Sequence, residues 1–485
     1  MSLNVNMYII NRSGGEALIP FRFIHAADMH VDSPFRGLQA LPDKLKEEVL
    51  ESTFAAWDNL VRLAIREKVD FVVISGDLYD GKERSLKAQW RLQRGMEQLY
   101  EQRIPVYLIH GNHDPLHREV KWEWPDNVTI FPTNAPQAVL VPNKDGAMVA
   151  VVCGMSYGDS AVYENLAAMY PDSPESAAVH SDHTARHDEC ALEANGNVNV
   201  KMKRLHRNQG DGSPRLFRIG VLHGTVDGRA GHDPYAPCSK RELIEKNYDY
   251  WALGHIHMRE VLNESPYIVY PGNTQGRHVK EIGAKGCYMV DVSEHGNVSL
   301  QFEPLDTVRW RQEQIDVNGI SSMQSIMQLL DEKMMAWKSG TEGRLTLIRL
   351  ELIGRTALYA SLQQEALAAQ WMEAWQAQEV DDSLFEGASG LLWPVALRVS
   401  CTPDIDVEQW EASDSFPGDM IRIARQAQQH EDTSEALIQD SLQTLQQHPR
   451  MRNWLASQSG EIQKEWIEEA MMLAVEWLQR EVKRS

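Results

Sequence analysis

No uninterrupted apolar run in this 485-residue sequence approaches the roughly 18 residues that a membrane-spanning helix needs. The first 20 residues contain no basic start followed by a long apolar core, so we expect a short leader and no secretory signal. Cysteine is scarce, and the five present are dispersed without the spacing of metal ligands. An odd, scattered set favours reduced thiols and a cytoplasmic location. The lack of a long apolar run predicts no membrane partner.

Basic residues are also in deficit. The 48 Lys and Arg residues are outnumbered by 69 Asp and Glu residues, and the net charge is −21. Residues 308–485 hold 16 basic and 28 acidic residues, which account for −12 of that charge. A surface that binds nucleic acid is usually basic, because it must neutralise phosphates. The charge balance therefore leaves room for other substrates, or for a partner that supplies the basic surface.

The chain does contain one sequence pattern that occurs five times, an apolar run followed by a residue that can bind a metal. Residues 71–75 form an apolar run of the kind that is buried on both faces of a sheet, and Gly76 and Asp77 follow it. Four other apolar runs end in a similar way, at 21–27, 105–111, 217–222 and 248–253. The metal-capable side chains at these strand ends are Asp28, His30, Asp77, Asn112, His223, His255 and His257. Hard oxygens with neutral imidazoles, and no thiolate, suit manganese, iron or zinc.

The segments between these runs predict an α/β fold. Helices are expected at 41–64, where apolar residues recur at helical spacing, and at 85–102. Two further strands, at 139–142 and 148–153, are expected to cross into a second sheet. Residues 172–215 are dominated by polar residues and are interpreted as a mobile insertion. No predicted strand or helix frames its metal-binding residue types, so we interpret them as incidental: His180, His183, His187 and Cys190.

The remainder of the chain contains no further metal motif. At 485 residues the chain is too long for one compact core, so two or three domains are expected. Residues 308–414 alternate predicted strands and helices, which indicates a small α/β domain. Residues 415–485 are expected to be helical, and the last helix carries an apolar stripe. That stripe either packs within its own domain or docks a partner; it consists of Trp466, Ile467, Met471, Ala474, Val475 and Leu478.

Taken together, the strand-end motifs resemble those of the calcineurin-like metallophosphoesterases: D-x-H at 28–30, G-D-x-x-D at 76–80, G-N-H-D at 111–114, H-G at 223–224 and G-H-x-H at 254–257. Finer features are similar to the YhaO-like branch of the SbcD-type DNA-repair exonucleases, at 25–35, 234–238, 248–257 and 270–278. The resemblance covers residues 20–310 well. It implies a four-layer α-β-β-α sandwich over 21–307, then a small α/β capping domain over 308–414 and a helical, partner-docking tail over 415–485.

The resemblance also implies a cofactor of two divalent metal ions, most often Mn²⁺. One ion would be held by Asp28, His30 and His257, and the other by Asn112, His223 and His255, with Asp77 bridging them. A carboxylate shared in this way holds two cations about 3.5–4 Å apart, the separation found in two-metal phosphoesterases.

Other residues of these motifs acquire expected roles in the same way. His113 is expected to be a catalytic group whose cationic ring stabilises the phosphorane-like charge or protonates the leaving 3′- or 5′-oxygen, with Asp114 orienting its imidazole. Asp32 and Asp80 are expected to fix the orientation of metal ligands. Either a contact with DNA phosphate or a structural role in a glycine-rich turn is expected for Arg277 and His278.

Three functions are open at this point. The leading hypothesis is a Mn²⁺-dependent DNA exonuclease or endonuclease for DNA repair or end processing, working as the nuclease subunit of a complex with an SMC-like ATPase. A homodimer is a further expectation. The first alternative, slightly favoured by the acidic charge, is a phosphoesterase for nucleotides, cyclic nucleotides or phosphoproteins. The second is a non-catalytic scaffold that regulates an ATPase partner, which the complete ligand set disfavours.

Overall fold

The structure is a computed structural model of the 485-residue chain. It describes residues 17–35, 38, 41–81, 85–116, 123–180, 215–228, 233–386, 390–404, 407–429, 431–456 and 460–484. The chain divides into two units, Met1–Arg311 with Gly343–Leu347, and Gln312–Glu342 with Ile348–Ser485. The predicted domain boundaries at 307/308 and 414/415 stay predictions. Residues 1–16 of the predicted leader, and His183, His187 and Cys190 of the predicted insertion, lie outside the described residues.

The first unit contains two β-sheets, and the first of them carries the motifs at 28–30, 76–80 and 111–114. Its six strands lie in the order β13 (Val298–Pro304), β12 (Gly286–Val292), β1 (Phe21–Ala26), β2 (Phe71–Ser75), β3 (Val106–Ile109) and β4 (Val128–Ile130). Strands β1 to β4 run parallel to one another. Strand β12 pairs antiparallel with β1, and β13 pairs antiparallel with β12. The residues that follow β1, β2 and β3 therefore meet at one edge of the sheet, the usual place for a site in such a fold.

The second sheet carries the two histidine motifs. Its seven strands lie in the order β10 (Glu260–Glu264), β11 (Tyr267–Tyr270), β9 (Tyr250–Gly254), β8 (Phe217–His223), β6 (Met148–Gly154), β5 (Gln137–Pro142) and β7 (Ala178–His180). Strands β8 and β9 are parallel, so His223 and His255 reach the same edge. Strand β7 and the preceding 3₁₀ turn η3 (Pro174–Ala177) lie within the predicted insertion. The loop prediction is wrong for these residues, because backbone pairing with β5 extends the sheet without an apolar pattern.

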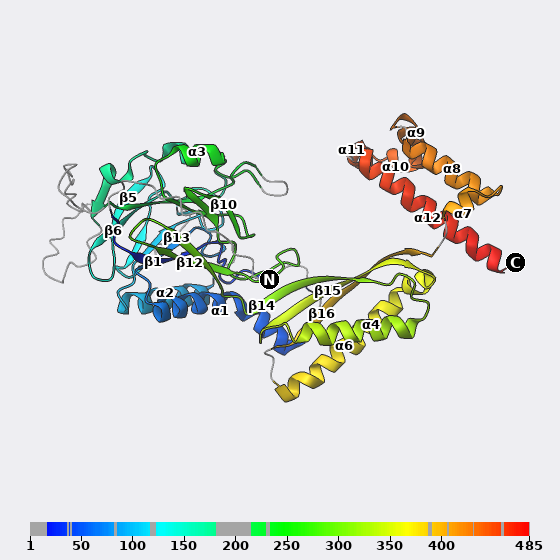
Figure 1. Cartoon of the computed structure of the whole chain (residues 1–485), viewed down its shortest axis with the longest axis horizontal. Helices are drawn as coiled ribbons and strands as arrows, with labels where there is room; N and C mark the ends of the chain where they lie inside the picture. Colours follow the sequence, from blue (N-terminus) through cyan, green and yellow to red (C-terminus); the bar gives the residue numbers. More distant parts are fainter. Residues whose placement is uncertain are drawn as a thin grey trace, which may run out of the picture. The chain divides into compact units, whose positions relative to one another are not determined.

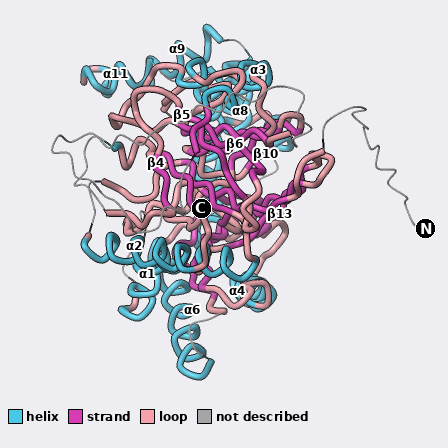
Figure 2. Tube along the Cα trace, turned by 90° about the vertical axis from the view of Figure 1, so that its left-hand side faces the viewer, coloured by secondary structure: helices cyan, strands magenta, loops and turns pink. Residues whose placement is uncertain are grey.

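Helices on both outer faces complete four layers. Helices α1 (Asp43–Glu67) and α2 (Leu86–Glu101) pack on the first sheet, and α3 (Lys240–Glu245) and η2 (Leu166–Met169) pack on the second. The strands lie between these two sets of helices (Figure 1, Figure 2). Between the sheets, the ring of Phe23 stacks on Phe71 at 5.0 Å and meets Tyr250 of the facing sheet edge-on at 5.5 Å. The predicted α-β-β-α sandwich is confirmed.

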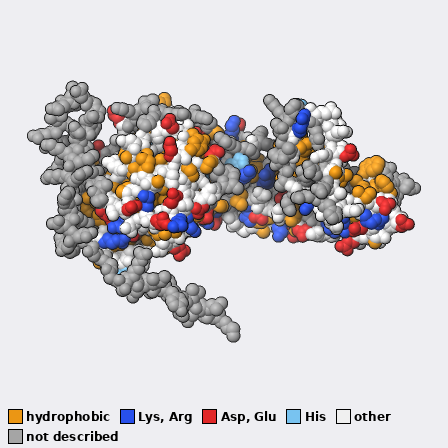
Figure 3. All heavy atoms as spheres, turned by 90° about the horizontal axis from the view of Figure 1, so that it is seen from above, with side chains coloured by type: hydrophobic (Ala, Val, Ile, Leu, Met, Phe, Trp, Pro, Cys, Tyr) orange, Lys and Arg blue, Asp and Glu red, His pale blue; other side chains and the backbone are white. Residues whose placement is uncertain are grey.

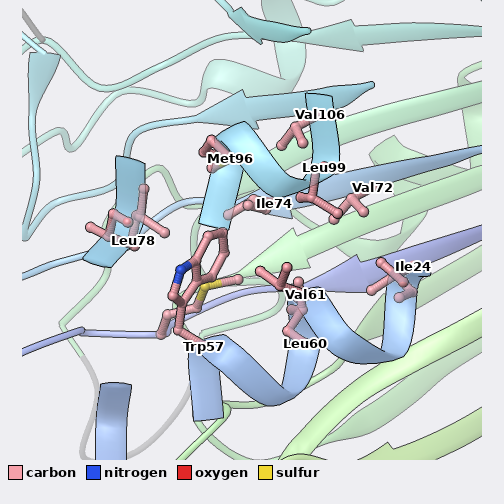
Figure 4. Packing of buried hydrophobic residues seen from close by; sticks show 14 of the residues in the cluster. Ile24, Trp57, Leu60, Val61, Val72, Ile74, Leu78, Met96, Leu99 and Val106 are labelled. Carbon is pink, nitrogen blue, oxygen red and sulfur yellow. The ribbon is translucent and has the colours of Figure 1, made fainter. Parts of the chain in front are cut away.

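Helices α1 and α2 approach each other closely at Gly95. Figure 4 shows Trp57 of α1 in the apolar cluster on the first sheet, and its Nε1–H donates to the carbonyl oxygen of Arg91 at 3.1 Å. A Cβ atom at Gly95 would lie 2.6 Å from Cε2 of the buried Trp57 ring. The glycine is therefore required by space, because the indole occupies the volume that a side chain would need.

We expect Gly95→Ala to destabilise the first unit by roughly 1–3 kcal/mol, the usual cost of overpacking. The sign is diagnostic, since Gly→Ala in a helix normally stabilises by about 1 kcal/mol. Denaturant unfolding measures the change, and Gln98→Ala on the exposed face of α2 is the control. An unchanged or increased free energy of unfolding in Gly95→Ala would contradict the packing argument.

The second unit includes a three-stranded sheet in the order β14 (Val308–Asp316), β15 (Leu345–Thr356) and β16 (Leu392–Pro403). The first residues of β14 and β15 belong to the first unit. Helices α4 (Met323–Lys338), α5 (Tyr359–Leu362) and α6 (Glu365–Glu386) pack on this sheet in one apolar cluster. Trp375 of α6 lies in that cluster and donates from Nε1 to Asp331 of α4 at 3.1 Å. This is the small α/β domain that the sequence predicts.

The rest of the second unit is helical, with α7 (Val407–Glu411), α8 (Phe416–Gln429), α9 (Glu431–Ser441), α10 (Gln443–Gln446), α11 (Pro449–Ala456) and α12 (Gly460–Arg484). Ile467, Met471 and Val475 of α12 are buried in a cluster with Ile421 and Ala424 of α8, so much of the apolar stripe packs within this tail. Apolar side chains also gather on the tail's surface, at the right of Figure 3. None of the helices in the described ranges is long and apolar enough to cross a membrane.

Candidate metal centre

Metal-capable side chains converge at the edge where strands of both sheets end. Each follows or ends a different strand, β1, β2, β3, β8 or β9 in turn: Asp28, Asp77, Asn112, His223 and His255. Asp28, Asp77 and His255 have left-handed backbone, with φ of 51°, 52° and 95°. Non-glycine residues adopt this conformation rarely, and the strain persists where surrounding structure aims a functional side chain.

Glycines leave space for the buried ring of His223 between the two sheets. A Cβ atom would lie 2.5 Å from Nδ1 of His223 if built on Gly76, and 2.8 Å from it if built on Gly254. That Nδ1–H donates to the carbonyl oxygen of Ser75 at 2.9 Å. The glycines that precede Asp77 and His255 in their motifs are therefore needed for the histidine to reach the site.

Asp28, His30 and His257 form the first candidate group, with their ligand atoms all within 4.8 Å of one another. Nε2 of His30 lies 3.2 Å from Nε2 of His257. Nδ1 of His257 donates to the carboxylate of Glu281 at 2.5 Å, so Nε2 of His257 carries the lone pair when the ring is neutral. A cation between the two rings would satisfy these nitrogens, and with the Asp28 carboxylate the donor set fits a divalent transition metal.

Asn112, His223 and His255 form the second group. The side-chain oxygen of Asn112 lies 3.0 Å from Nε2 of His223 and 3.3 Å from Nδ1 of His255. Nδ1 of His223 donates to Ser75, which leaves Nε2 facing Asn112. Burial would lower the pKa of His223, but the charge of Asp77 and the hydrogen bond to it raise that pKa to about 9, so a metal ion at Nε2 would replace a proton. Burial, with the charge of His223 adding to it, lowers the pKa of His255 to about 3, so this ring is in the neutral form that binds metals.

Asp77 lies between the two groups. Its Oδ2 is 3.6 Å from Nε2 of His30 and 3.5 Å from Nε2 of His223. Burial by itself would raise the pKa of Asp77, but the charge and hydrogen bond of His223 and the charge of His30 lower it well below its usual range. Asp77 is therefore a carboxylate, placed where a ligand shared by two cations would stand. The structure brings all seven predicted ligands together; their division between two ions stays a prediction.

The partner of His113 differs from our expectation. Nδ1 of His113 lies 3.3 Å from a carboxylate oxygen of Asp80, whereas the buried carboxylate of Asp114 accepts from the backbone N–H groups of Leu78 at 2.9 Å and Gly111 at 2.7 Å. Asp114 therefore holds the motif loop together and does not orient His113. Burial would lower the pKa of His113, but the hydrogen bond to Asp80 and the charge of Asp77 outweigh it, and the pKa is raised.

Asp32 connects the first motif to helix α2. Its carboxylate accepts from the backbone N–H of Ser85 at 3.2 Å, and its own N–H donates to Oγ1 of Thr53 at 3.1 Å. Ser85 caps α2, because its side chain accepts from the N–H of Ala88. Asp32 therefore ties the first motif to the start of α2, and its expected role in orienting a metal ligand stays a prediction.

Glu281 belongs to the site although sequence reasoning missed it. It lies in the irregular segment between β11 and β12, where no strand end or motif marks it. One carboxylate oxygen accepts from Nδ1 of His257, and the other accepts from the backbone N–H groups of Arg277 at 2.6 Å and His278 at 3.2 Å. Burial would raise its pKa, but the hydrogen bond and charge of His257 and the backbone of Arg277 lower it to about 2. Glu281 thus orients His257 as a carboxylate.

We expect Glu281→Gln to weaken Mn²⁺ binding about tenfold to hundredfold, the usual cost of losing the group behind a metal-binding histidine. The amide keeps the size of the side chain and removes its charge. Isothermal titration calorimetry of the metal-free protein measures the affinity, with the exposed Glu294→Gln as control. Unchanged affinity would show that His257 does not depend on Glu281 to bind a metal.

Arg277 and His278 lie beside this centre. Both line a cavity of about 210 Å³ together with Asp80, His113 and His257. Nδ1 of His278 accepts from the backbone N–H of Lys280 at 3.1 Å. The structure therefore brings both predicted phosphate-contact residues next to the metal-capable groups, while the contact itself stays a prediction.

Comparison with known proteins agrees with this geometry. Residues 21–259 match the family described as calcineurin-like phosphoesterase, and residues 310–402 match the middle domain of the metallophosphoesterase YhaO. YhaO of Bacillus subtilis is 34% identical over 460 residues, which cover 94% of this chain and 97% of that protein. The DNA double-strand break repair protein Mre11 of Thermoplasma acidophilum is 22% identical over 350 residues, covering 70% and 79% of the two chains. Mre11 of Methanococcus maripaludis is 33% identical over 93 residues, covering 19% and 23%.

The match to YhaO extends over nearly the whole of both chains, and it includes both structural units described above. Among the described residues, the groups that could hold a metal lie within the segment that matches the phosphoesterase family. Glu281, which accepts from His257, lies just beyond that segment. The chain belongs to the calcineurin-like metallophosphoesterases, in the YhaO-like branch, and is a metal-dependent phosphodiesterase of the hydrolase class.

Proposed function

We propose that this chain is a Mn²⁺-dependent DNA nuclease that cleaves phosphodiester bonds by a two-metal mechanism, in DNA repair or end processing. The observation that carries the proposal is the position of Asp77, whose Oδ2 lies 3.6 Å from His30 and 3.5 Å from His223, between two complete donor groups. The role of the Mre11 relatives in DNA double-strand break repair supports DNA as the substrate. The proposed ligands are Asp28, His30 and His257 for one ion, Asn112, His223 and His255 for the other, and Asp77 for both.

The chain's own residues supply acid catalysis. Two divalent cations, when bound, would lower the pKa of a water molecule and offset the negative charge of the phosphate. Asp80 accepts from Nδ1 of His113, which leaves the Nε2–H of the protonated ring to donate to the leaving oxygen. The raised pKa of His113 keeps more of the ring protonated near neutral pH. The backbone N–H of His113 also donates to Asp77 at 2.9 Å, which sets the distance of the acid from the metal ligands.

Labelled single- and double-stranded DNA, incubated with the purified protein and Mn²⁺, tests the proposal. We expect cleavage that EDTA abolishes and Mn²⁺ restores, alongside hydrolysis of bis-p-nitrophenyl phosphate. Cyclic nucleotides and a phosphopeptide belong in the same assay, because a net charge of −21 favours substrates other than DNA. Hydrolysis of those substrates without DNA cleavage would establish the phosphoesterase alternative. Absence of all hydrolysis in metal-loaded protein would favour the scaffold.

We further place the docking site for an SMC-like ATPase on the helical tail. A cavity of about 580 Å³ lies between α8, α9, α11 and α12 and is lined almost entirely by apolar residues. Ile423 and Trp454 line it and are 62% and 49% exposed. Trp454 stacks on Trp466 at 5.7 Å, which forms a flat apolar wall. A groove of this kind suits the apolar face of a partner's amphipathic helix.

A homodimer and a cytoplasmic location stay predictions.

We expect Ile423→Glu to abolish co-purification with a co-expressed SMC-like ATPase, because a docked helix would bury an unpaired carboxylate. Hydrolysis of bis-p-nitrophenyl phosphate should be unchanged, since the groove belongs to the second unit. Phe416→Glu is the matched control: Phe416 is 70% exposed on the same helix and does not line the cavity. Retained co-purification of Ile423→Glu, or equal loss in both variants, would contradict docking at this groove.

A further inference from the structure

The cavity of about 210 Å³ lies beside the candidate metal ligands and not over them. His257 and His113 are the members of the candidate metal groups that line it; the other lining residues are Pro34, Asp80, Arg277, His278 and Glu281. Asp77, which stands between the two donor groups, is not part of the lining. A ligand in the cavity would therefore be a neighbour of the phosphate that the metal ligands receive.

Arg277 lines this cavity, and one nitrogen of its guanidinium is unsatisfied. Its Nε atom is buried and has no hydrogen-bond partner among the residues that the structure describes. A buried donor without an acceptor is destabilising, and a guanidinium remains charged at any physiological pH. Carboxylate and phosphate oxygens are the ligands that match the planar donors of a guanidinium.

The carboxylates of the cavity do not compete for Arg277 Nε. Asp80 is engaged with Nδ1 of His113 at 3.3 Å, and Glu281 is engaged with His257 and two backbone N–H groups. His278 adds a second donor, because its Nδ1 accepts from the N–H of Lys280 and its Nε2 then carries the proton of the neutral ring. The cavity therefore offers donors to an anion.

Glu281 holds Arg277 at a fixed place relative to the metal ligands. One oxygen of its carboxylate accepts from the backbone N–H of Arg277 at 2.6 Å, and the other accepts from Nδ1 of His257 at 2.5 Å. A single side chain thus links the turn that carries the guanidinium to a candidate ligand. Such support is what a binding site needs to present its groups with little loss of entropy.

We propose that Arg277, positioned by Glu281, forms an anion subsite for the phosphate that adjoins the scissile phosphodiester on the leaving-group side. The side follows from His113, the proposed proton donor to the leaving oxygen, which lines the same cavity. The inference rests on the proposed nuclease function and deepens it, because it names a second phosphate as the feature that distinguishes a nucleic-acid strand from a simple phosphodiester.

Thymidine dinucleotides test the subsite. With Mn²⁺, kcat and KM are measured for thymidylyl-thymidine and for its 5′- and 3′-phosphorylated forms. We expect the wild-type protein to show a KM about tenfold to hundredfold lower for one of the two phosphorylated forms, the size expected for one charge-assisted interaction. Arg277→Gln should erase that preference, so that its loss is about tenfold to hundredfold larger on the preferred phosphorylated dinucleotide than on the unphosphorylated one. Arg277→Lys should retain part of the preference, because it keeps the charge and loses the planar donors.

Two controls keep the result interpretable. Arg259→Gln removes an exposed arginine whose guanidinium lies 4.0 Å from the centroid of the Phe302 ring, and it should keep the preference. Calorimetric titration of the metal-free proteins with the three dinucleotides repeats the comparison without catalysis. A preference that persists in Arg277→Gln, an equal loss on all three dinucleotides, or no preference in the wild type would overturn the subsite. Failure of the proposed function is a separate result, namely no DNA cleavage by the wild type, and the titration still decides the subsite in that case.

Discussion

Replacing Asp77 with asparagine is expected to lower hydrolysis of every phosphodiester substrate by more than about 10³-fold and to leave one bound metal ion or none. Its Oδ2 lies almost equally far from Nε2 of His30 and Nε2 of His223, one ligand of each donor group. Without this carboxylate, two cations would repel each other with no anion between them. The amide fills the same buried volume, so the fold should be retained. Activity on DNA and on bis-p-nitrophenyl phosphate, with metal content by mass spectrometry, measures both effects.

A carboxylate elsewhere in the same unit provides the control for Asp77. Asp291 pairs with Arg22 at 2.6 Å on the first sheet and belongs to none of the metal-capable groups found among the described residues. Asp291→Asn should keep both ions and full activity. Two tightly bound ions in Asp77→Asn would contradict the assignment of Asp77 as a bridging ligand, even if activity were lost.

The second large effect is expected at His113. His113→Ala should lower the rate by roughly 10²–10⁴-fold, the range for a positioned acid–base group, while both metal ions remain bound. The side chain of His113 is 38% exposed, lines the cavity beside the metal ligands and is oriented by Asp80. The loss should fall on kcat for substrates with a poor leaving group, because those substrates depend most on proton donation.

Metal content decides the role of His113, since its ring also lies within 4.8 Å of ligand atoms of His30 and Asp77. Loss of an ion in His113→Ala would make it a ligand, and the division of labour between Asn112 and His113 would be wrong. Asp80→Asn should reproduce part of the rate loss with both ions bound. His295→Ala, at an exposed histidine, is the control and should change neither quantity.

The fold class and the metal-capable residues could be predicted from the sequence because both depend on local patterns. A run such as Phe71–Ser75 is buried on both faces of a sheet wherever it packs, and the residue after a parallel strand must emerge at the strand's carboxyl edge. The motif glycines follow from the same constraint, as the space around His223 shows at Gly76. Repetition of this arrangement on five strands was sufficient to indicate one shared centre.

The tertiary structure alone decided which polar groups serve which ligands. Asp114 directly follows His113 in the chain, yet its carboxylate accepts from the backbone N–H groups of Leu78 and Gly111. Asp80, which belongs to another motif, lies 3.3 Å from Nδ1 of His113. Glu281 reaches His257 from 24 positions away, through an irregular segment that no periodicity describes. Hydrogen bonds between loops depend on how separate strands bring those loops together. A local pattern of residues does not contain the distances between such loops.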